Sequence, residues 1–234
     1  MKIALLGYGK MGRTIERIAI ERGHEIVLKA DSNVDVSGLN NADVAIDFSI
    51  PTAALNNIIS CCKSKVPVIS GTTGWLQDYP QAVKACEEYE SAFLYASNFS
   101  IGVNLFFELN RKLASLMEPF KEYAVAIEEI HHTQKLDAPS GTAISLAEQI
   151  IANSSVEGWD LNEVKENHIP ITAKRIDDVP GTHTISYTSK ADTIEIKHTA
   201  HSREGFALGA VIAAEWINGK KGVFSMKDVL SGIK

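Results

Sequence analysis

The first hundred residues alternate short apolar runs with amphipathic stretches, and this alternation limits most narrowly how the chain can fold. Apolar runs that predict strands lie at 2–6, 25–30, 43–49, 66–70 and 92–96, and helical spacing lies at 11–22, 51–63 and 79–89. Strands that alternate with helices form a parallel sheet with helices on both faces. About a dozen residues join 30 to 43, near the lower limit for a parallel crossover, so we do not expect a full helix there.

A glycine motif follows the first predicted strand and opens the first predicted helix. In GYGKMG, the residues Gly7, Gly9 and Gly12 match the pattern GxGxxG. Glycine permits a tight turn and lets the backbone approach a pyrophosphate, whose charge is favoured by the N–H groups and dipole at a helix start. A glycine turn without a ligand is the alternative, but the position between strand and helix favours a dinucleotide. The segment predicts cofactor contacts from Gly7, Tyr8, Gly9, Lys10, Met11 and Gly12.

The end of the second predicted strand bears on which dinucleotide binds. Asp31 stands about 20 residues after the glycines, where an acid can bind the adenosine ribose hydroxyls. Ser32 follows it, where an arginine would be expected to hold a 2′-phosphate. This favours NAD or the use of both nucleotides, while Lys29 leaves NADP open.

Two further loops follow later strands, at the edge where open α/β sheets bind ligands. One contains Gly71, Thr72 and Thr73, followed by a further glycine, and the other contains Ser97, Asn98 and Phe99. Hydroxyl, amide and backbone groups suit ribose and carboxamide contacts, although the same residues also form plain turns. Their position at strand ends favours contacts with the nicotinamide half of a cofactor.

The pattern changes after residue 100. A long amphipathic helix is predicted at 102–117, a strand at 123–131 and a helix from about Ser140; strand-like alternation follows at 171–175, 183–189 and 193–198. An alanine-rich helix at 204–216 precedes a short strand and helix within 223–230. We therefore predict an α/β chain with an N-terminal Rossmann-like parallel sheet and an α+β substrate domain with an open mixed sheet.

Composition excludes several classes of protein. A net charge of −6 and a pI of about 5.7 argue against a nucleic-acid partner. The chain has no apolar run of about 18 residues and no secretory signal, so we expect a soluble cytoplasmic protein without a membrane partner. Three cysteines, Cys61, Cys62 and Cys86, indicate reduced thiols, with a redox-active adjacent pair as the less favoured alternative.

The densest chemical signal is the segment 128–143, EEIHHTQKLDAPSGTA. Histidine can give or take a proton near neutral pH, lysine supplies a cation, and a helix N-terminus offers N–H donors to a carboxylate. Together they suit an anionic substrate that is to be protonated. Metal binding by His131 and His132 is an alternative, but no third ligand stands at the usual spacing on the same element, so we predict no metal. A solvated surface segment is the other alternative.

This segment makes the resemblance to a known family specific. HHTQKLDAPSGTA resembles the signature of the 4-hydroxy-tetrahydrodipicolinate reductase family, and GxGxxG, GTTG, ASNFS and HSREGFALGAVIAAEWI match the family in the same order. The resemblance covers nearly the whole chain. It implies a dinucleotide-binding domain at 1–99 and 206–234, because the carboxy terminus returns to it, and a substrate-binding and oligomerisation domain at 100–205.

The resemblance also implies roles for single residues. His131 would donate or accept a proton and Lys135 would donate one, while His132, Ser140, Gly141 and Thr142 would bind substrate. The implied reaction is hydride transfer from NADH or NADPH to a cyclic imine dicarboxylate, giving tetrahydrodipicolinate in diaminopimelate and lysine biosynthesis. Family members form homotetramers through the open sheet.

The residues alone also leave two other functions open. Another small Rossmann oxidoreductase, such as an amino-acid dehydrogenase, would not need the cluster around His131 and Lys135. A nucleotide sensor without catalytic activity would not need it either. The cluster therefore favours the reductase.

Overall fold

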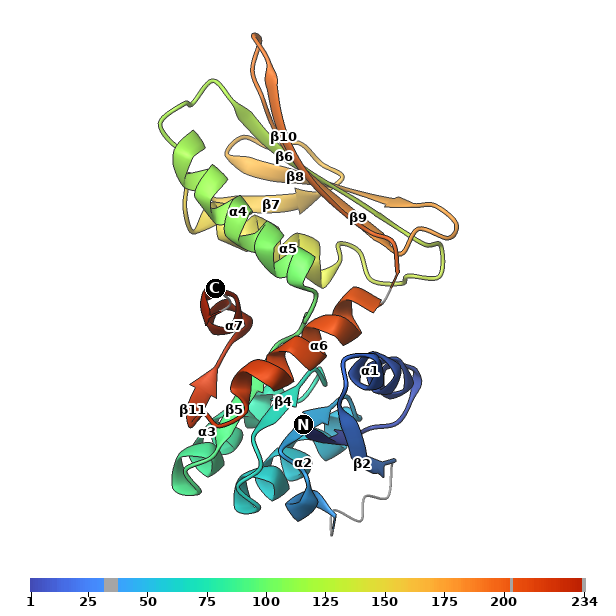
Figure 1. Cartoon of the computed structure of the whole chain (residues 1–234). Helices are drawn as coiled ribbons and strands as arrows, with labels where there is room; N and C mark the ends of the chain where they lie inside the picture. Colours follow the sequence, from blue (N-terminus) through green and yellow to red (C-terminus); the bar gives the residue numbers. More distant parts are fainter. Residues whose placement is uncertain (32–37, 203, 233–234) are drawn as a thin grey trace. The chain divides into compact units, whose positions relative to one another are not determined.

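The computed structural model describes residues 1–31, 38–202 and 204–232 (Figure 1). The chain divides into two compact units, one formed by residues 1–104 with 204–234 and the other by residues 105–203. That the first unit binds the dinucleotide and the second binds the substrate stays a prediction. Ser32, which bears on the choice of nucleotide, lies outside the described residues. Among the residues that the structure describes, no helix is both long and apolar enough to cross a membrane.

The first unit is built on a six-stranded sheet whose paired strands are all parallel. Its order is β11-β5-β4-β3-β1-β2. The strands are β1 (Lys2–Leu6), β2 (Glu25–Ala30), β3 (Val44–Asp47), β4 (Val68–Ser70), β5 (Ala92–Tyr95) and β11 (Gly222–Phe224). The last strand, β11, pairs with β5, so the C-terminal segment completes the sheet that the N-terminal segment begins.

Helices cover both faces of this sheet, as the alternation of strands and helices predicts. Helices α1 (Lys10–Glu21) and α6 (Glu204–Ile217) pack on one face, against side chains such as Ile3, Leu5 and Ile46. Helices α2 (Pro51–Lys63) and α3 (Tyr79–Glu88) pack on the other face, against Ala4 and Leu6. Neighbouring residues of β1 thus enter different cores, which explains why the central strands are apolar throughout. Short helical segments complete the unit: α7 (Met226–Gly232), η1 (Leu39–Asn41) and η2 (Leu76–Asp78).

The second unit contains a five-stranded mixed sheet. Its order is β10-β9-β6-β8-β7, with β9 antiparallel to both neighbours and β6, β8 and β7 mutually parallel. The strands are β6 (Ala124–His131), β7 (Gly158–Leu161), β8 (His168–Arg175), β9 (Gly181–Thr188) and β10 (Thr193–Ala200). Within the described part of this unit, the helices α4 (Ile101–Met117) and α5 (Gly141–Ile151) cover one face, through Phe106, Leu146 and their neighbours. The predicted fold class, a parallel Rossmann-like sheet and an open mixed sheet, is confirmed.

Candidate active site

The loop after β1 shows which glycines the backbone itself requires. Gly7 has φ +95°, and a Cβ atom there would lie 2.2 Å from the carbonyl oxygen of Phe48. A Cβ on Gly12 would lie 2.4 Å from the carbonyl oxygen of Gly7. At Gly9, by contrast, a Cβ would meet no atom within 4 Å, and no side chain caps the first turn of α1, which Gly9 precedes. Gly7 and Gly12 therefore shape the loop, and Gly9 leaves space where a phosphate could approach the helix N-terminus.

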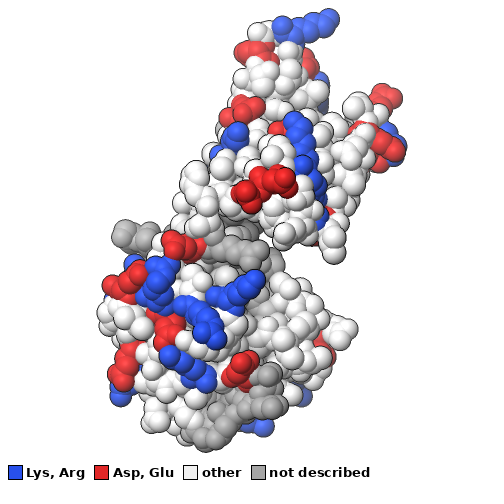
Figure 2. All heavy atoms as spheres, turned by 90° about the vertical axis from the view of Figure 1, so that its right-hand side faces the viewer, with Lys and Arg blue, Asp and Glu red and all other residues white. Residues whose placement is uncertain are grey.

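Charged side chains surround the ring of Tyr8 in this loop. The Arg13 guanidinium carbon lies 5.0 Å from the ring centroid and the Lys29 ammonium lies 5.1 Å from it. The Tyr8 hydroxyl donates a hydrogen bond to Glu16, which also pairs with Lys29, and these two contacts lower the pKa of Glu16. Figure 2 shows lysine and arginine side chains gathered on this unit, with acidic side chains among them. Lys10 and Asp31 are both exposed, Asp31 directly after β2.

A cavity of about 250 Å³ joins the glycine loop to the loop after β4. Met11, Gly71, Thr72 and Thr73 all line it, so four predicted cofactor residues meet at one place in the first unit. A Cβ on Gly71 would lie 2.4 Å from the ring of Phe48, so a larger residue there would require this ring to move.

A buried carboxylate, that of Asp47, organises this edge of the sheet. It ends β3 and accepts hydrogen bonds from the hydroxyls of Ser49 (2.6 Å), Ser70 (2.7 Å) and Thr72 (2.9 Å) and from the Asn57 amide (2.9 Å). Burial raises the pKa of Asp47, and the four donors oppose that rise. The donors come from two loops, a strand and a helix, so the carboxylate holds the loop after β3 against the loop after β4.

The segment Ser97–Asn98–Phe99 follows β5 but does not line this cavity. The Asn98 side-chain oxygen accepts a hydrogen bond from the backbone N–H of Ser100 (2.9 Å), and the Asn104 amide donates to the Asn98 carbonyl (2.9 Å). Phe99 is 1% exposed and its ring lies 5.7 Å from that of Phe48. A cofactor contact from Phe99 would therefore come from its backbone.

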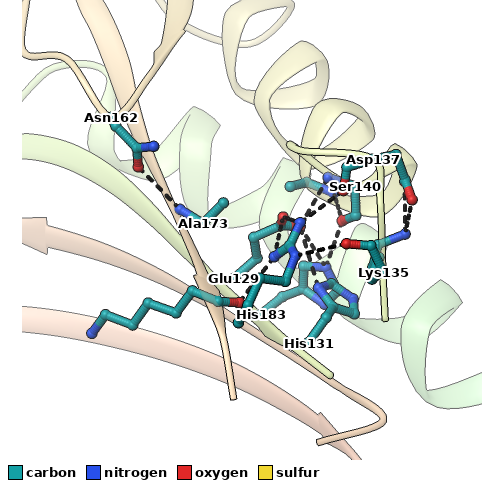
Figure 3. Close-up of polar contacts among 11 residues, drawn as sticks. Glu129, His131, Lys135, Asp137, Ser140, Asn162, Ala173 and His183 are labelled. Atoms are coloured by element: carbon teal, nitrogen blue, oxygen red, sulfur yellow. Dashed lines mark hydrogen bonds and ion pairs between the residues drawn. The ribbon is translucent and has the colours of Figure 1, made fainter. Parts of the chain in front are cut away.

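In the second unit, two predicted residues converge on a buried carboxylate that the sequence did not single out (Figure 3). Glu129 is fully buried, and its Oε2 lies 3.6 Å from His131 Nδ1, 3.7 Å from His183 Nε2 and 3.0 Å from the Ser140 N–H that donates to it. The His131 and His183 rings meet edge to face at 5.1 Å. The Ser140 hydroxyl lies 3.1 Å from His183 Nε2.

Burial governs the protonation of both imidazoles. It lowers the pKa of His183 to about 4, helped by the neighbouring His131, so His183 is neutral at physiological pH. Burial also lowers the pKa of His131, while the Glu129 carboxylate acts in the opposite direction. The charge on His131 is therefore set by a balance: burial and the cations Lys135 and Arg175 lower its pKa, and the carboxylates Glu129 and Asp137 raise it.

The loop after β6 places Lys135 close to this cluster. Its ammonium bonds both carboxylate oxygens of Asp137, at 2.7 Å and 2.6 Å, which lowers the pKa of Asp137. Arg175 on β8 holds the backbone of the same loop, because its guanidinium donates to the carbonyls of Lys135 (3.3 Å) and Asp137 (2.7 Å). Lys135 is thus presented on a loop of fixed backbone while its own side chain is 21% exposed.

Helix α5 begins beside the cluster, at the predicted substrate residues. The Ser140 hydroxyl accepts a hydrogen bond from the Ala143 N–H (3.2 Å) and so caps the helix. Gly141 and Thr142 form the first turn, and a Cβ on Gly141 would meet no atom within 4 Å. Their position at a helix start provides N–H groups for an anion.

His132 does not join its neighbour His131. It lines a separate cavity of about 460 Å³ within the second unit, with Thr133, Asp177 and Pro180 among the other lining residues. Its Nδ1 is buried and has no hydrogen-bond partner among the described residues.

The residues Glu129, His131 and His183 also have the chemistry of a metal-ligand set. One ligand atom from each lies within 4.8 Å of the others. His131 and His132 have no third ligand at the usual spacing on their own element, whereas the fold supplies His183 from β9. The Arg175 guanidinium lies 3.3 Å from Glu129 Oε1, and its charge disfavours a second cation at that carboxylate. A proton-transfer site therefore agrees better with this arrangement than a metal centre does.

Sequence reasoning missed Asp47, Glu129, Arg175 and His183. Glu129 stands inside the segment 128–143. The feature that could have revealed it is a charged residue at a position where the alternation of β6 faces the core. Arg175 and His183 lie on other strands and reach the site only through strand pairing, which the sequence did not reveal.

Comparison with known proteins places these features in one family. The family model described as the N-terminus of dihydrodipicolinate reductase matches residues 1–99, and the model of its C-terminus matches residues 102–230. A 4-hydroxy-tetrahydrodipicolinate reductase of Christiangramia forsetii is 60% identical over 236 residues, which cover 100% of this chain and 99% of the relative. A protein of the same description from Neisseria gonorrhoeae is 34% identical and covers 98% of this chain and 97% of its own length.

A solved structure agrees in fold. The dipicolinate-bound dihydrodipicolinate reductase of Paenisporosarcina sp. TG-14 has a TM-score of 0.77, at 24% identity, over 96% of this chain and 97% of its own. The predicted family and enzyme class, a reductase that uses NADH or NADPH, are confirmed by the family models and the full-length relative. The chain belongs to the dihydrodipicolinate reductase family.

Proposed function

We propose that the chain transfers a hydride from NADH or NADPH to 4-hydroxy-tetrahydrodipicolinate, a cyclic dicarboxylate, and releases tetrahydrodipicolinate. The observation that carries this proposal is the meeting of His131, Lys135 and the N-terminus of α5 at one place in the second unit. An acid, a cation and N–H donors together suit a substrate that brings carboxylates and needs a proton.

The first unit supplies the residues for the cofactor. The open position at Gly9 and the uncapped start of α1 suit the pyrophosphate, and Tyr8 and Lys10 lie in the same loop. The cavity at Met11, Gly71, Thr72 and Thr73 suits the nicotinamide half, with Ser97, Asn98 and the Phe99 backbone as further contacts. The bound cofactor supplies the hydride.

The second unit supplies the residues for substrate and proton. Gly141 and Thr142 would hold a carboxylate through their backbone N–H groups, Ser140 would fix the start of α5, and His132 would contact substrate from its own cavity. Lys135 would exchange Asp137 for the substrate and, with protonated His131, stabilise the negative charge that builds up as the hydride arrives. One hydride and one proton then complete the reduction of the conjugated imine, after loss of the 4-hydroxyl as water.

Three finer assignments belong to this proposal. Asp31 favours NADH or the use of both nucleotides, since its carboxylate suits free ribose hydroxyls and Lys29 already pairs with Glu16. The chain acts as a homotetramer, with the open sheet of the second unit as the contact. It works in the cytoplasm, in diaminopimelate and lysine biosynthesis.

The test is the decay of nicotinamide absorbance with freshly made substrate and either nucleotide. We expect turnover by the native chain and a loss of roughly 10²–10⁴-fold in kcat for His131→Ala with Lys135→Ala, the usual contribution of general acids. Nucleotide binding without turnover would contradict the proposal and favour a nucleotide sensor. Turnover of an amino acid in its place would favour another Rossmann oxidoreductase.

A further inference from the structure

The carboxylate of Glu129 is the most completely buried charge beside the proposed proton donor. Its two oxygens have different partners. Oε1 lies 3.3 Å from both terminal nitrogens of Arg175, while Oε2 accepts the Ser140 N–H and faces the two imidazoles. A buried charge needs such compensation, because taking it out of water is costly.

This pair fixes the loop 132–140 at three backbone groups. Arg175 bonds the carbonyls of Lys135 and Asp137, and Glu129 bonds the backbone N–H of Ser140. The loop residues between these points form no helix or strand. The pair therefore takes the place of regular secondary structure in holding Lys135 and the start of α5 together.

The geometry at His131 gives the same carboxylate a second role. Nδ1 of His131 is buried and has no hydrogen-bond partner among the described residues, and Glu129 Oε2 lies 3.6 Å away, just beyond hydrogen-bond distance. The other ring nitrogen, Nε2, lies 3.1 Å from the place a Cβ on Gly181 would occupy. An imidazolium N–H with a carboxylate usually closes to about 2.7–2.9 Å, so protonation would draw the two groups together.

We propose that Glu129 is a positioning residue of the active site: held by Arg175, it stabilises the protonated form of His131 and ties the Lys135 loop to the start of α5. The inference rests on the proposed function. The charged and titratable groups that face His131 are Glu129 on its own strand, His183 on β9, Arg175 on β8, and Lys135 and Asp137 in the loop. Glu129 and Asp137 are the acids among them, and Asp137 is paired with Lys135 and 62% exposed.

Glu129→Gln removes the charge at nearly the same shape. Its amide oxygen can still accept the Ser140 N–H, while its amide nitrogen replaces the oxygen that accepts from Arg175, so that contact is lost. We expect the pH limb of kcat that belongs to His131 to move to lower pH by about one unit. At neutral pH kcat should fall by up to about tenfold, because a one-unit fall in pKa lowers the protonated fraction of His131 by at most that factor, and KM should change little. The activity lost should return in part as the pH is lowered.

The matched control is Asp160→Asn. Asp160 is another carboxylate of the same sheet paired with a histidine, since its Oδ2 lies 2.5 Å from His168 Nδ1, and it contacts none of the site residues described above. Its removal should leave kcat and the pH profile unchanged. A Glu129→Gln protein with a native pH profile and native kcat would overturn the proposal.

A second readout does not depend on turnover. In protein labelled with ¹⁵N-histidine, the signal of His131, assigned through His131→Asn, should titrate at lower pH in Glu129→Gln than in the native chain. An unchanged titration of His131 in Glu129→Gln would refute the role of Glu129. A native protein that turned over no substrate would instead count against the proposed function, and the titration would still test the role of Glu129.

Arg175→Lys provides the alternative variant if Glu129→Gln does not fold. It keeps the positive charge but cannot donate to two loop carbonyls and a carboxylate at once. We expect KM for the substrate to rise by roughly tenfold while the titration of His131 stays near native. Native kcat and KM in this variant would contradict the positioning of the loop.

Discussion

Among the residues that the structure describes, each unit contains one buried carboxylate that gathers donors from separate elements. Asp47 ends β3 in the first unit, and Glu129 lies near the end of β6 in the second. Both are fully buried, and both bond groups on neighbouring loops. Ligand-binding loops carry little regular structure, so a buried charge with several fixed donors can define their geometry.

Asp31 is expected to determine nucleotide preference. Asp31→Asn should lower kcat/KM for NADH by roughly tenfold, since hydrogen bonds to a charged group contribute about 1.5–3 kcal/mol. The kcat/KM for NADPH should stay unchanged or rise, because the substitution removes a negative charge near the place where the 2′-phosphate would bind. Steady-state rates with each nucleotide check this, with Asp43→Asn as control, whose carboxylate instead accepts the Lys2 N–H at 2.7 Å. Equal losses with both nucleotides would contradict the assignment.

His183 should make the stability of the chain depend on pH. Its pKa is about 4 when folded and about 6.5 when unfolded, so the unfolded chain takes up a proton first as the pH falls. This contribution is complete above pH 6.5 and is lost as the pH falls towards 4. Urea unfolding should show a loss of roughly 2 kcal/mol from this group between pH 7 and pH 5. In His183→Asn the pH dependence should shrink by a similar amount; an unchanged slope would argue that the imidazole is hydrated.

At the scale of the elements, each unit has a helix N-terminus beside the residues proposed to bind its ligand. Helix α1 starts after Gly9 and α5 starts with Gly141, and at both glycines a Cβ would meet nothing within 4 Å. The two helix starts would thus offer equivalent positions to the two proposed anionic ligands. Since the space is open, a methyl group there should affect a ligand more than the fold.

This equivalence allows a crossed experiment. Gly9→Ala should weaken NADH binding by roughly tenfold, because the methyl group would occupy space near the proposed pyrophosphate position. It should leave unchanged the binding of dipicolinate, used here as a stable analogue of the proposed cyclic dicarboxylate substrate. Gly141→Ala should weaken dipicolinate binding by roughly tenfold and leave NADH binding unchanged. Calorimetric titration of both ligands against both variants provides the measurement, with thermal unfolding to check the fold. Loss of both ligands in one variant would indicate a general change in structure.

Hydrophobic periodicity predicts most elements of this chain but not all of them. The central strands of the first sheet are buried on both faces, so they stand out as apolar runs. Strand β7 was missed because its four residues, Gly158–Leu161, are all partly buried and show no alternation. The closing segment 223–230 divides into a three-residue strand and a helix that starts at Met226.

The site, like the fold, was predictable from the sequence only where its residues lie close together along the chain. His131, Lys135 and Ser140 lie in one continuous segment, so their residue types alone signalled chemistry. Arg175 stands 46 positions after Glu129, and only the parallel pairing of β6 with β8 brings them together. Sequence patterns find local clusters, whereas partners across a sheet depend on register.

At the scale of the whole molecule, the uncovered face of the second sheet is the expected assembly surface. Ile185 and Tyr187 point into the core beneath α4 and α5, so Ser186 lies on the opposite face, in register with Ala126 and Glu195. The small side chains of Ser186 and Ala126 leave room there for another sheet to approach.

Light scattering should give the native protein about four times the 25.5 kDa mass of the chain. Ser186→Arg, which places a long charged side chain on this face, should lower that mass. Ser115→Arg on α4 makes the same change at an exposed position of the covered side and should leave the mass unchanged. A single-chain mass for the native protein, or an unchanged mass in Ser186→Arg, would argue against the tetramer.

The return of the chain to its first sheet has a consequence for biosynthesis. Helix α6 supplies Ala207, Ala210, Val211 and Ala214 to the core of the first unit, and Gly209 packs so closely that a Cβ would lie 1.8 Å from the Phe99 carbonyl oxygen. A ribosome makes these residues only after the whole of 105–203 has been translated. The second unit, being continuous, can therefore finish folding first, while in the nascent first unit the sheet face that α1 and α6 share is covered by α1 alone until α6 emerges.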